Sequence, residues 1–423
     1  MRFFVLQNGL ESRATHYFNE SLAWRDVCAQ QGIACRIYAN RKAPASITQP
    51  LGAMPVFSFA ADDGVRFDPT TQAMHDMVFK GDFFTRECRV LDAHGVNAAD
   101  VVIVPYAGAA EMLGLARWLE ARREAERPRV VTIMHRQGGD WRLDERRETV
   151  VAGPVGPLRY GAQRLERAAR PGRFLFAANS ERLATILSHV AGIPAAALPV
   201  LLRHGLASLM SDREGDAALP AFRGRRFDIG LLGEFRSEKG GQVALEALAH
   251  CFGEHPGLSV VIQVADKAQA AIVSEALAGV PGTGGLALVM GPLSPDDFET
   301  CVGACRLLAL PYHPRRYAAR VSGLFAEAAA WGRPVVAPGE TWMSDMIAAG
   351  RAAGELFGAL TAQDIAGAVS RALADLPALS ARARALAPAW RRSECMEAAV
   401  ARIAGWAGTD DDAAAPLRDA ARS

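Results

Sequence analysis

The stretch that decides the fold is FDIGLLGEFRSEKGG, residues 227–241. It starts with a short apolar run, passes through Gly233 and a charged turn, and ends at Lys239 and two glycines. An amphipathic segment, residues 241–251, follows directly. An apolar strand that leads through a glycine-containing loop into a helix is the repeating unit of a parallel α/β sheet.

The same alternation continues on both sides of this stretch. Buried parallel strands are predicted from continuous apolar runs rather than from alternating ones. The C-terminal half gives strands at 227–232, 258–264, 286–290, 307–310 and 334–337, with helices at 241–251, 267–277, 295–305 and 322–331. The N-terminal half gives strands at 3–7, 34–38, 101–105, 130–134 and 174–177, with helices at 17–30 and 181–190, the second capped by Ser180. We therefore expect an α/β protein with two Rossmann-like, doubly wound domains.

Composition breaks suggest where these domains end. Residues 208–226 are rich in polar residues, Gly and Pro, and are expected to link an N-terminal domain (1–207) to a C-terminal domain (227–390). A last helix, residues 391–407, could pack back on the N-terminal domain, and residues 408–423 are expected to be a disordered tail. Ligands of doubly wound sheets bind beyond the carboxyl ends of the strands, so two such domains facing each other would form a cleft.

The bulk properties exclude several classes of protein. With 47 basic and 46 acidic residues the formal net charge is +1, which argues against a nucleic-acid partner. The seven cysteines form no CxxC pair, which indicates free thiols in a reducing compartment. The first residues lack the apolar core of a signal peptide, and no apolar run approaches the ~20 residues of a membrane span. These features predict a soluble cytoplasmic protein that could touch the inner membrane peripherally.

One candidate ligand site lies in residues 311–343, where a strand, an arginine-rich loop and a helix follow one another. Ser322, Gly323 and Leu324 open this helix, whose first N–H groups could hold a phosphate. Arg320 precedes them and could add a charged hydrogen bond. Glu327 lies one turn further on, too far for a phosphate but suitably placed for ribose hydroxyls. Glycine and arginine are also common in ordinary surface loops, so the residues alone leave both readings open.

The second candidate is the turn after residues 227–232. Gly233, Arg236 and Lys239 would lie at the carboxyl end of the first strand of the domain, where a diphosphate needs cations. The turn matches neither GxGxxG nor the Walker pattern GxxxxGK[ST], which argues against a dehydrogenase or an ATP site. A solvated turn would explain the same residues.

Together these two segments resemble the donor-binding half of GT-B fold glycosyltransferases of the family 4 type. The family turn G-R-L-x-x-E-K-G stands here as GEFRSEKG, residues 233–240. The family pattern G-x-x-x-x-E-A-x-A-x-G-x-P-V-V is matched from its glutamate, Glu327, to Val336, and Gly323 stands four residues before that glutamate where the pattern has five. The strand that leads into this loop, CRLLALP at residues 305–311, is also similar.

The resemblance implies a retaining, metal-independent transfer of sugar from a nucleoside diphosphate sugar, with no further cofactor. Lys239 would bind the diphosphate, Glu327 the ribose, and the backbone at Ser322, Gly323 and Leu324 a phosphate. Stabilising the charge of the leaving diphosphate would be the main catalytic task.

Two positions depart from the family pattern. Glu234 stands where the family has arginine directly after the first glycine, and Arg236 could supply the missing charge. Ala319 stands where the family often has a second glutamate, eight residues before Glu327. A GT-B protein that binds a nucleotide sugar without transferring it is therefore an alternative.

The N-terminal half is expected to bind a glycan, a lipid-linked molecule or another acceptor at its strand ends. Candidates are Asn8 and Gly9 after the first strand, and Tyr106 and Gly108 after residues 101–105. His135, after residues 130–134, is the candidate catalytic histidine, because a strand-end imidazole can bind a sugar hydroxyl or move a proton. His16 is a weaker alternative, and a purely structural histidine would explain the same position.

Two further interpretations concern the N-terminal domain. The basic stretch between Arg159 and Arg173 could contact anionic lipid, although a solvated helix face is the common explanation. A nucleotide-sugar epimerase of the same architecture would need carboxylates beside the sugar, and Asp140 and Glu111 are the evident candidates in this half.

Overall fold

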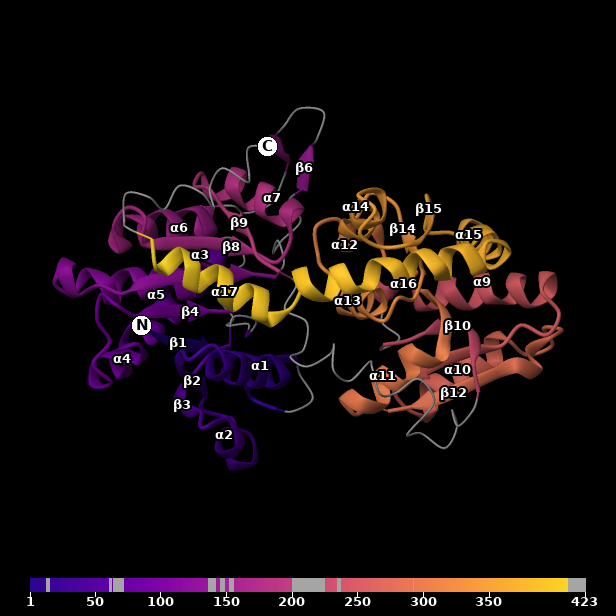
Figure 1. Cartoon of the computed structure of the whole chain (residues 1–423), viewed down its shortest axis with the longest axis horizontal. Coiled ribbons are helices and arrows are strands. Elements are labelled where there is room, and N and C mark those ends of the chain that lie inside the picture. Colours follow the sequence, from indigo (N-terminus) through magenta and orange to yellow (C-terminus); the bar gives the residue numbers. More distant parts are fainter. Residues whose placement is uncertain are drawn as a thin grey trace. The chain divides into compact units, whose positions relative to one another are not determined.

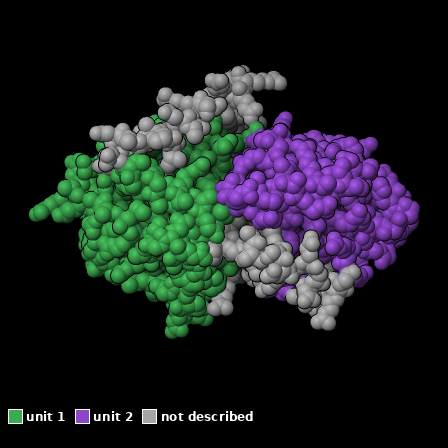
Figure 2. Space-filling view, in the orientation of Figure 1, with its two compact units in different colours: residues 1–204, 395–423 green, residues 205–394 purple. Residues whose placement is uncertain are grey.

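A computed structural model describes residues 1–12, 16–60, 63, 72–135, 142–144, 149–151, 156–199, 225–233, 237–291 and 293–409. The chain divides into two compact units, shown separately coloured in Figure 2. Unit 1 contains residues 1–204 together with 395–423, and unit 2 contains residues 205–394. The expected linker, residues 208–226, and the expected tail, residues 408–423, fall almost entirely outside the described residues.

Within the described residues, unit 1 is built on seven parallel strands in the order β3-β2-β1-β4-β5-β8-β9. They are β1 (Arg2–Gln7), β2 (Ala34–Asn40), β3 (Met54–Phe57), β4 (Val101–Val104), β5 (Arg129–Met134), β8 (Phe174–Ala178) and β9 (Ala196–Ala197). β4 and β5 are buried along their whole length, as continuous apolar strands covered on both faces must be. A separate antiparallel pair consists of β6 (Arg142–Asp144) and β7 (Thr149–Val151).

Helices cover both faces of this sheet (Figure 1). They are α1 (His16–Gln30), α2 (Ala45–Leu51), α3 (Gln72–Glu87), α4 (Arg89–Ala93), α5 (Ala109–Glu120), α6 (Gly156–Ala169), α7 (Glu181–Ala191) and α17 (Met396–Ala407), with a 3-10 turn at η1 (Glu124–Glu126). α3, α5 and α6 pack on one another, whereas α1 packs against α2 and α17. The last described helix, α17, thus contributes Met396, Val400, Ile403 and Trp406 to the same core as β1 and α1.

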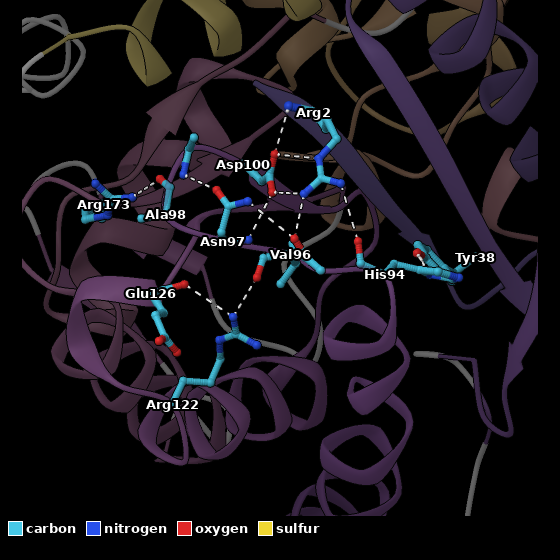
Figure 3. Close-up of polar contacts among 12 residues, drawn as sticks. Arg2, Tyr38, His94, Val96, Asn97, Ala98, Asp100, Arg122, Glu126 and Arg173 are labelled. Carbon is cyan, nitrogen blue, oxygen red and sulfur yellow. Dashed lines mark hydrogen bonds and ion pairs between the residues drawn. The ribbon is translucent and has the colours of Figure 1, made fainter.

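The amino-terminal edge of the unit 1 sheet is held by a polar network around Asp100 (Figure 3). The guanidinium of Arg2 donates to Asp100 through Nε (3.0 Å) and Nη2 (2.6 Å). The backbone N–H of Asn97 donates to the same carboxylate (3.0 Å). Burial alone would raise the pKa of Asp100, but these bonds outweigh it and hold the pKa below its ordinary value. The network joins β1 to the start of β4 and is structural.

Unit 2 is built, within its described residues, on six parallel strands in the order β12-β11-β10-β13-β14-β15. They are β10 (Phe227–Leu231), β11 (Val260–Val264), β12 (Leu286–Met290), β13 (Cys305–Ala309), β14 (Val335–Pro338) and β15 (Gly354–Phe357). β10 pairs with β11 on one side and with β13 on the other. The strand order therefore reverses between β10 and β13.

The unit 2 helices are joined to these strands by short loops. They are α9 (Gly241–Glu254), α10 (Lys267–Ala276), α11 (Pro295–Ala304), α12 (Pro314–Tyr317), α13 (Gly323–Ala330), α14 (Trp342–Ala348), α15 (Ala362–Ala374) and α16 (Leu376–Ser393), with 3-10 turns at η3 (Ser237–Lys239) and η4 (Thr283–Gly285). Helices begin where a side-chain oxygen can cap them: Ser180, Asp266, Ser294, Ser322, Thr341 and Thr361 each accept from a first-turn N–H. α9, α10 and α15 share one core with β10 and β11.

The C-terminal helix expected at residues 391–407 is wrong in one respect, because two helices meet there. α16 ends at Ser393 and α17 begins at Met396, with Cys395 in an extended conformation between them. Glu394 at this break forms an ion pair with Arg351. No glycine or proline marks the break, so the sequence pattern does not reveal it. None of the helices in the described part of the chain is both long and apolar enough to cross a bilayer.

Candidate functional site

The topology of unit 2 selects one edge of its sheet. In an open parallel sheet, ligands bind beyond the carboxyl ends of the strands where the strand order reverses. That point lies between β10 and β13, and the loops that follow these two strands are residues 232–240 and 310–322. Both segments singled out in the sequence therefore begin at the same edge.

A pocket that is open to solvent lies at this edge. Its lining contains two of the predicted donor residues, Gly233 and Lys239, together with Leu231, Leu232, Gly241, Ala309, Pro311 and Tyr312. Gly241 is the first residue of α9, whose N-cap Gly240 supplies no side-chain hydrogen bond. The pocket thus combines a lysine with a helix N-terminus, both of which favour an anion.

Two glycines give this pocket its shape. At Gly240 (φ 67°) an added Cβ would come within 2.0 Å of the carbonyl oxygen of Pro311, so no other residue fits. At Gly233 (φ 93°) an added Cβ would lie 2.8 Å from Lys239 Nζ. The ammonium of Lys239 also lies 5.8 Å from the centre of the Tyr312 ring. Lys239 is therefore held between the backbone of Gly233 and an aromatic face.

The segment Ser322, Gly323, Leu324 and Glu327 forms the start of α13 and does not line this pocket. Ser322 is buried, and its hydroxyl accepts from Phe325 N (3.1 Å), so it caps the helix. Leu324 is buried in the core, Gly323 is exposed, and Glu327 is half-buried. A Cβ at Gly323 would meet nothing within 4 Å, so packing does not require glycine there.

The remaining charged candidates behave differently. Arg320 forms an ion pair with Glu238 (3.4 Å), which joins the loop after β13 to the loop after β10. His313 N also donates to the carbonyl oxygen of Glu238 (3.0 Å). Ala319, at the position of the missing family glutamate, is fully buried. Arg236 and Glu234 lie outside the described residues.

Unit 1 has its own reversal of strand order, between β1 and β4. The loops after these strands carry the acceptor candidates, and a buried carboxylate connects them. Glu111 accepts from Asn8 Nδ2 (2.8 Å) and from Gly108 N (2.9 Å). Burial raises the pKa of Glu111. The structure thus brings Asn8 and Gly108 together, but both donate to Glu111. The burial of Glu111 argues against the epimerase interpretation, in which this carboxylate would lie beside the sugar.

Tyr106 and His135 are also brought together. Their rings stack with centres 4.0 Å apart and planes inclined by 15°. Tyr17 meets Tyr106 edge-on at 4.6 Å, and His16 lies 5.0 Å from it. The Tyr17 ring also occupies the space next to Gly9, where an added Cβ would come within 2.6 Å of it. Gly9 therefore serves ring packing.

The surroundings of His135 determine its protonation. Burial, with a smaller contribution from His16, lowers its pKa to about 3, so the imidazole is uncharged at neutral pH. Asn179 Nδ2 lies 3.1 Å from His135 Nδ1, and Nε2 of the same ring is buried. With so low a pKa, His135 is a weak base at neutral pH.

Three polar side chains at strand ends were missed in the sequence. Gln7 closes β1, is fully buried, and its amide makes no hydrogen bond within the described residues. Asn179 follows β8 and holds His135. Gln263 interrupts the otherwise apolar β11, VVIQV. A polar residue at the end of an apolar strand is the signal that could have identified Gln7 and Asn179.

The basic stretch between Arg159 and Arg173 is largely bonded to unit 1 itself. Arg159 donates to the carbonyl oxygen of Val190 (2.9 Å), and Arg164 pairs with Glu120 (2.7 Å). Two more of its five arginines make similar contacts: Arg170 pairs with Glu124, and the buried Arg173 donates to the carbonyl oxygen of Ala98. Most of these charges are therefore already used in structure, and the lipid contact stays a prediction.

Comparison with known proteins supports the architecture. No protein-family model and no curated protein matches the chain. Solved structures do match it over almost their whole length. A glycosyltransferase from Rickettsia africae is 10% identical, with 96% of this chain and 97% of that chain covered and a TM-score of 0.63. Anabaena HepE in complex with UDP-glucose is 14% identical (96% and 98% covered, TM-score 0.56). A UDP-GlcNAc 2-epimerase from Neisseria meningitidis bound to UDP-GlcNAc is 13% identical (96% and 99% covered, TM-score 0.57).

At these identities the likeness establishes the fold. The chain has a GT-B type α/β fold, with parallel sheets of seven and six strands in its described residues. The predicted fold class is thereby confirmed.

Proposed function

We propose that this protein is a glycosyltransferase of the family 4 type, which transfers a sugar from a nucleoside diphosphate sugar to a glycan, a lipid-linked molecule or another acceptor. One observation carries the proposal: Gly233, Lys239 and the start of α9 line one pocket at the point where the strand order of unit 2 reverses.

The donor diphosphate binds in this pocket. Lys239 contributes a positive charge beside the first turn of α9, and the two together neutralise the two phosphates. The exposed Gly323 at the start of α13 leaves open space for a phosphate or ribose oxygen, and Glu327 accepts from the ribose hydroxyls. No metal ion is needed, because these groups supply the positive charge that the leaving diphosphate requires.

The acceptor binds at the carboxyl edge of the unit 1 sheet. The stacked pair of Tyr106 and His135 contributes an aromatic face, and the imidazole of His135 is uncharged. The role of His135 is then to orient a substrate hydroxyl. A retaining outcome is what the family resemblance implies.

Nucleotide binding tests the donor site directly. Isothermal titration with UDP, GDP, ADP and CMP, each with and without EDTA, should give one strong ligand whose affinity EDTA leaves unchanged. Lys239→Ala and Glu327→Ala should each weaken that ligand by about 10- to 100-fold, the ratio expected for a lost charged hydrogen bond. Lys267→Ala, at an exposed lysine of unit 2, is the matched control. Wild-type affinity in both site variants would refute this assignment.

Sugar transfer needs its own assay, because binding alone is also expected of a non-catalytic GT-B protein. Incubation of the corresponding nucleotide sugar with the enzyme should release the nucleoside diphosphate, faster when a suitable acceptor is present. Absence of both hydrolysis and transfer across a panel of acceptors would favour the non-catalytic alternative.

A nucleotide-sugar epimerase is the second candidate, because an epimerase bound to UDP-GlcNAc shares the fold. The buried bonds of Glu111 to Asn8 and Gly108 argue against it as a proton-transfer group. Incubation with UDP-GlcNAc, followed by chromatography for its 2-epimer, distinguishes the two reactions: accumulation of the epimer would favour the epimerase.

A further inference from the structure

Gln263 occupies an unusual position beside the donor pocket. It is the fourth of the five residues of β11 (Val260–Val264), and its four neighbours in the strand are valine or isoleucine. The residue is only 8% exposed. A buried carboxamide must find partners for both its oxygen and its nitrogen, and burying it without them is costly. Its partners therefore show what the residue is for.

Both partners are backbone groups in loops at the carboxyl edge of the sheet. Gln263 Oε1 accepts from Gly233 N (2.7 Å), and Gln263 Nε2 donates to the carbonyl oxygen of Gly291 (3.2 Å). Gly233 follows β10 and Gly291 follows β12, so one amide spans the ends of three adjacent strands. Both glycines have positive φ angles, 93° and 88°, which are conformations that few other residues adopt. The amide thus ties together two loops that turn at glycines.

Fixing Gly233 also fixes the lysine above it. A Cβ added to Gly233 would lie 2.8 Å from Lys239 Nζ, so the ammonium packs directly against the backbone of Gly233. Because Gly233 N is bonded to Gln263, this N–H is not a phosphate ligand. Gly233 contributes to the pocket through its shape alone.

We propose that Gln263 is a positioning residue of the donor site: it holds the loops after β10 and β12 in one arrangement and thereby places Lys239 for the nucleoside diphosphate. The proposal rests on the proposed function. It follows that Gln263 acts on donor binding without touching the donor, and that its effect passes through Lys239.

Two substitutions separate the bonds of the carboxamide. Gln263→Met keeps the length of the side chain and removes both hydrogen bonds. Gln263→Glu keeps an acceptor for Gly233 N but loses the donor to Gly291 and adds a negative charge beside the anion site. Gln269→Met is the matched control, since Gln269 also accepts from a backbone N–H, that of Ala265 (2.9 Å), but away from Gly233.

The experiment combines isothermal titration with hydrogen exchange of the ligand-free protein. The titrant is the nucleoside diphosphate that wild-type protein binds. Gln263→Met should weaken it about tenfold and speed amide exchange in peptides that contain Gly233 and Gly291. Gln263→Glu should weaken binding further while exchange at Gly233 stays closer to wild type. In the Lys239→Ala background, Gln263→Met should have little additional effect on affinity, a result that a general loss of stability would not produce.

The outcomes are distinguishable. If wild type binds the nucleotide and Gln263→Met, with the melting temperature of a folded protein, binds it within twofold of wild type, the positioning role is wrong and the donor site stands. Additive effects of Gln263→Met and Lys239→Ala would overturn it as well. If wild-type protein binds no nucleoside diphosphate, the proposed function fails, and the positioning role fails with it.

Discussion

Replacing Gly233 by alanine is the sharpest single perturbation of the donor pocket. The added methyl group would stand 2.8 Å from Lys239 Nζ, closer than carbon and nitrogen tolerate, and the backbone at φ 93° is unfavourable for alanine. The flexible end of the lysine side chain is the part that can yield. We therefore expect Gly233→Ala to act on binding by displacing a charge and on stability by straining one residue.

These two effects have different magnitudes. The left-handed backbone costs about 1–2 kcal/mol of stability. Displacing the ammonium removes a charged hydrogen bond to phosphate, about 1.5–3 kcal/mol, or roughly a 10- to 100-fold rise in Kd. The rise in Kd should disappear in the Lys239→Ala background, because no ammonium is left to displace, whereas the loss of stability should remain.

Isothermal titration on the four members of this double-mutant cycle measures the coupling, and urea denaturation measures the strain. Gly253→Ala is the control within the neighbouring α9, since a Cβ at Gly253 meets nothing within 4 Å. Equal weakening by Gly233→Ala in the presence and absence of Lys239 would refute the reasoning, because the methyl group would then act on the ligand or the loop and not on the lysine.

Three further predictions concern unit 1. Burial raises the pKa of Glu20 to about 7 from its ordinary 4.5. The contribution of the protonated Glu20 to the free energy of unfolding is therefore fully present below pH 4.5 and is lost as the pH rises through 7, a loss of about 3 kcal/mol. Glu20→Gln should abolish this dependence, which urea denaturation at pH 5 and pH 8 measures. The same change in unfolding free energy between pH 5 and pH 8 in wild type and Glu20→Gln would contradict this prediction. Asp100→Asn should lower the free energy of unfolding by about 1–3 kcal/mol, because it breaks the ion pair with Arg2. Arg2→Lys, which keeps the charge but not the paired donors of the guanidinium, should cause a smaller loss than Asp100→Asn. Trp406→Ala should destabilise unit 1 by about 3–5 kcal/mol, measured by thermal denaturation, and an unchanged melting curve would show that α17 does not complete this core.

The strands that could be predicted are those whose sequence is dominated by burial. The runs at residues 101–105 and 130–134 are apolar throughout because both faces of the sheet are covered, and the structure gives β4 and β5 within one residue of them. Elements with weaker patterns were missed. β3 begins with an exposed methionine and proline, and β15 is half-buried along three of its four residues, so neither shows a continuous apolar run.

The candidate site divides in the same way. Lys239 and Gly233 could be identified because a local motif, a turn after a strand, carries them, and the structure brings both into one pocket. Gln263 could not, because its partners Gly233 and Gly291 are each about 30 residues away in sequence. The stacking of Tyr106 on His135 likewise depends on the pairing of β4 with β5, which a single sequence does not specify.

The position of α17 has a consequence for how the protein is made. Its side chains complete the core formed by β1 and α1, yet some 190 residues of unit 2 are translated between the two parts. The apolar face of the unit 1 sheet therefore leaves the ribosome well before α17, the helix that covers it, has been translated. During that interval the nascent chain exposes an apolar surface of the kind that chaperones bind. A version circularly permuted to place residues 395–409 ahead of Met1 would shorten this exposure and should give a higher yield of native protein.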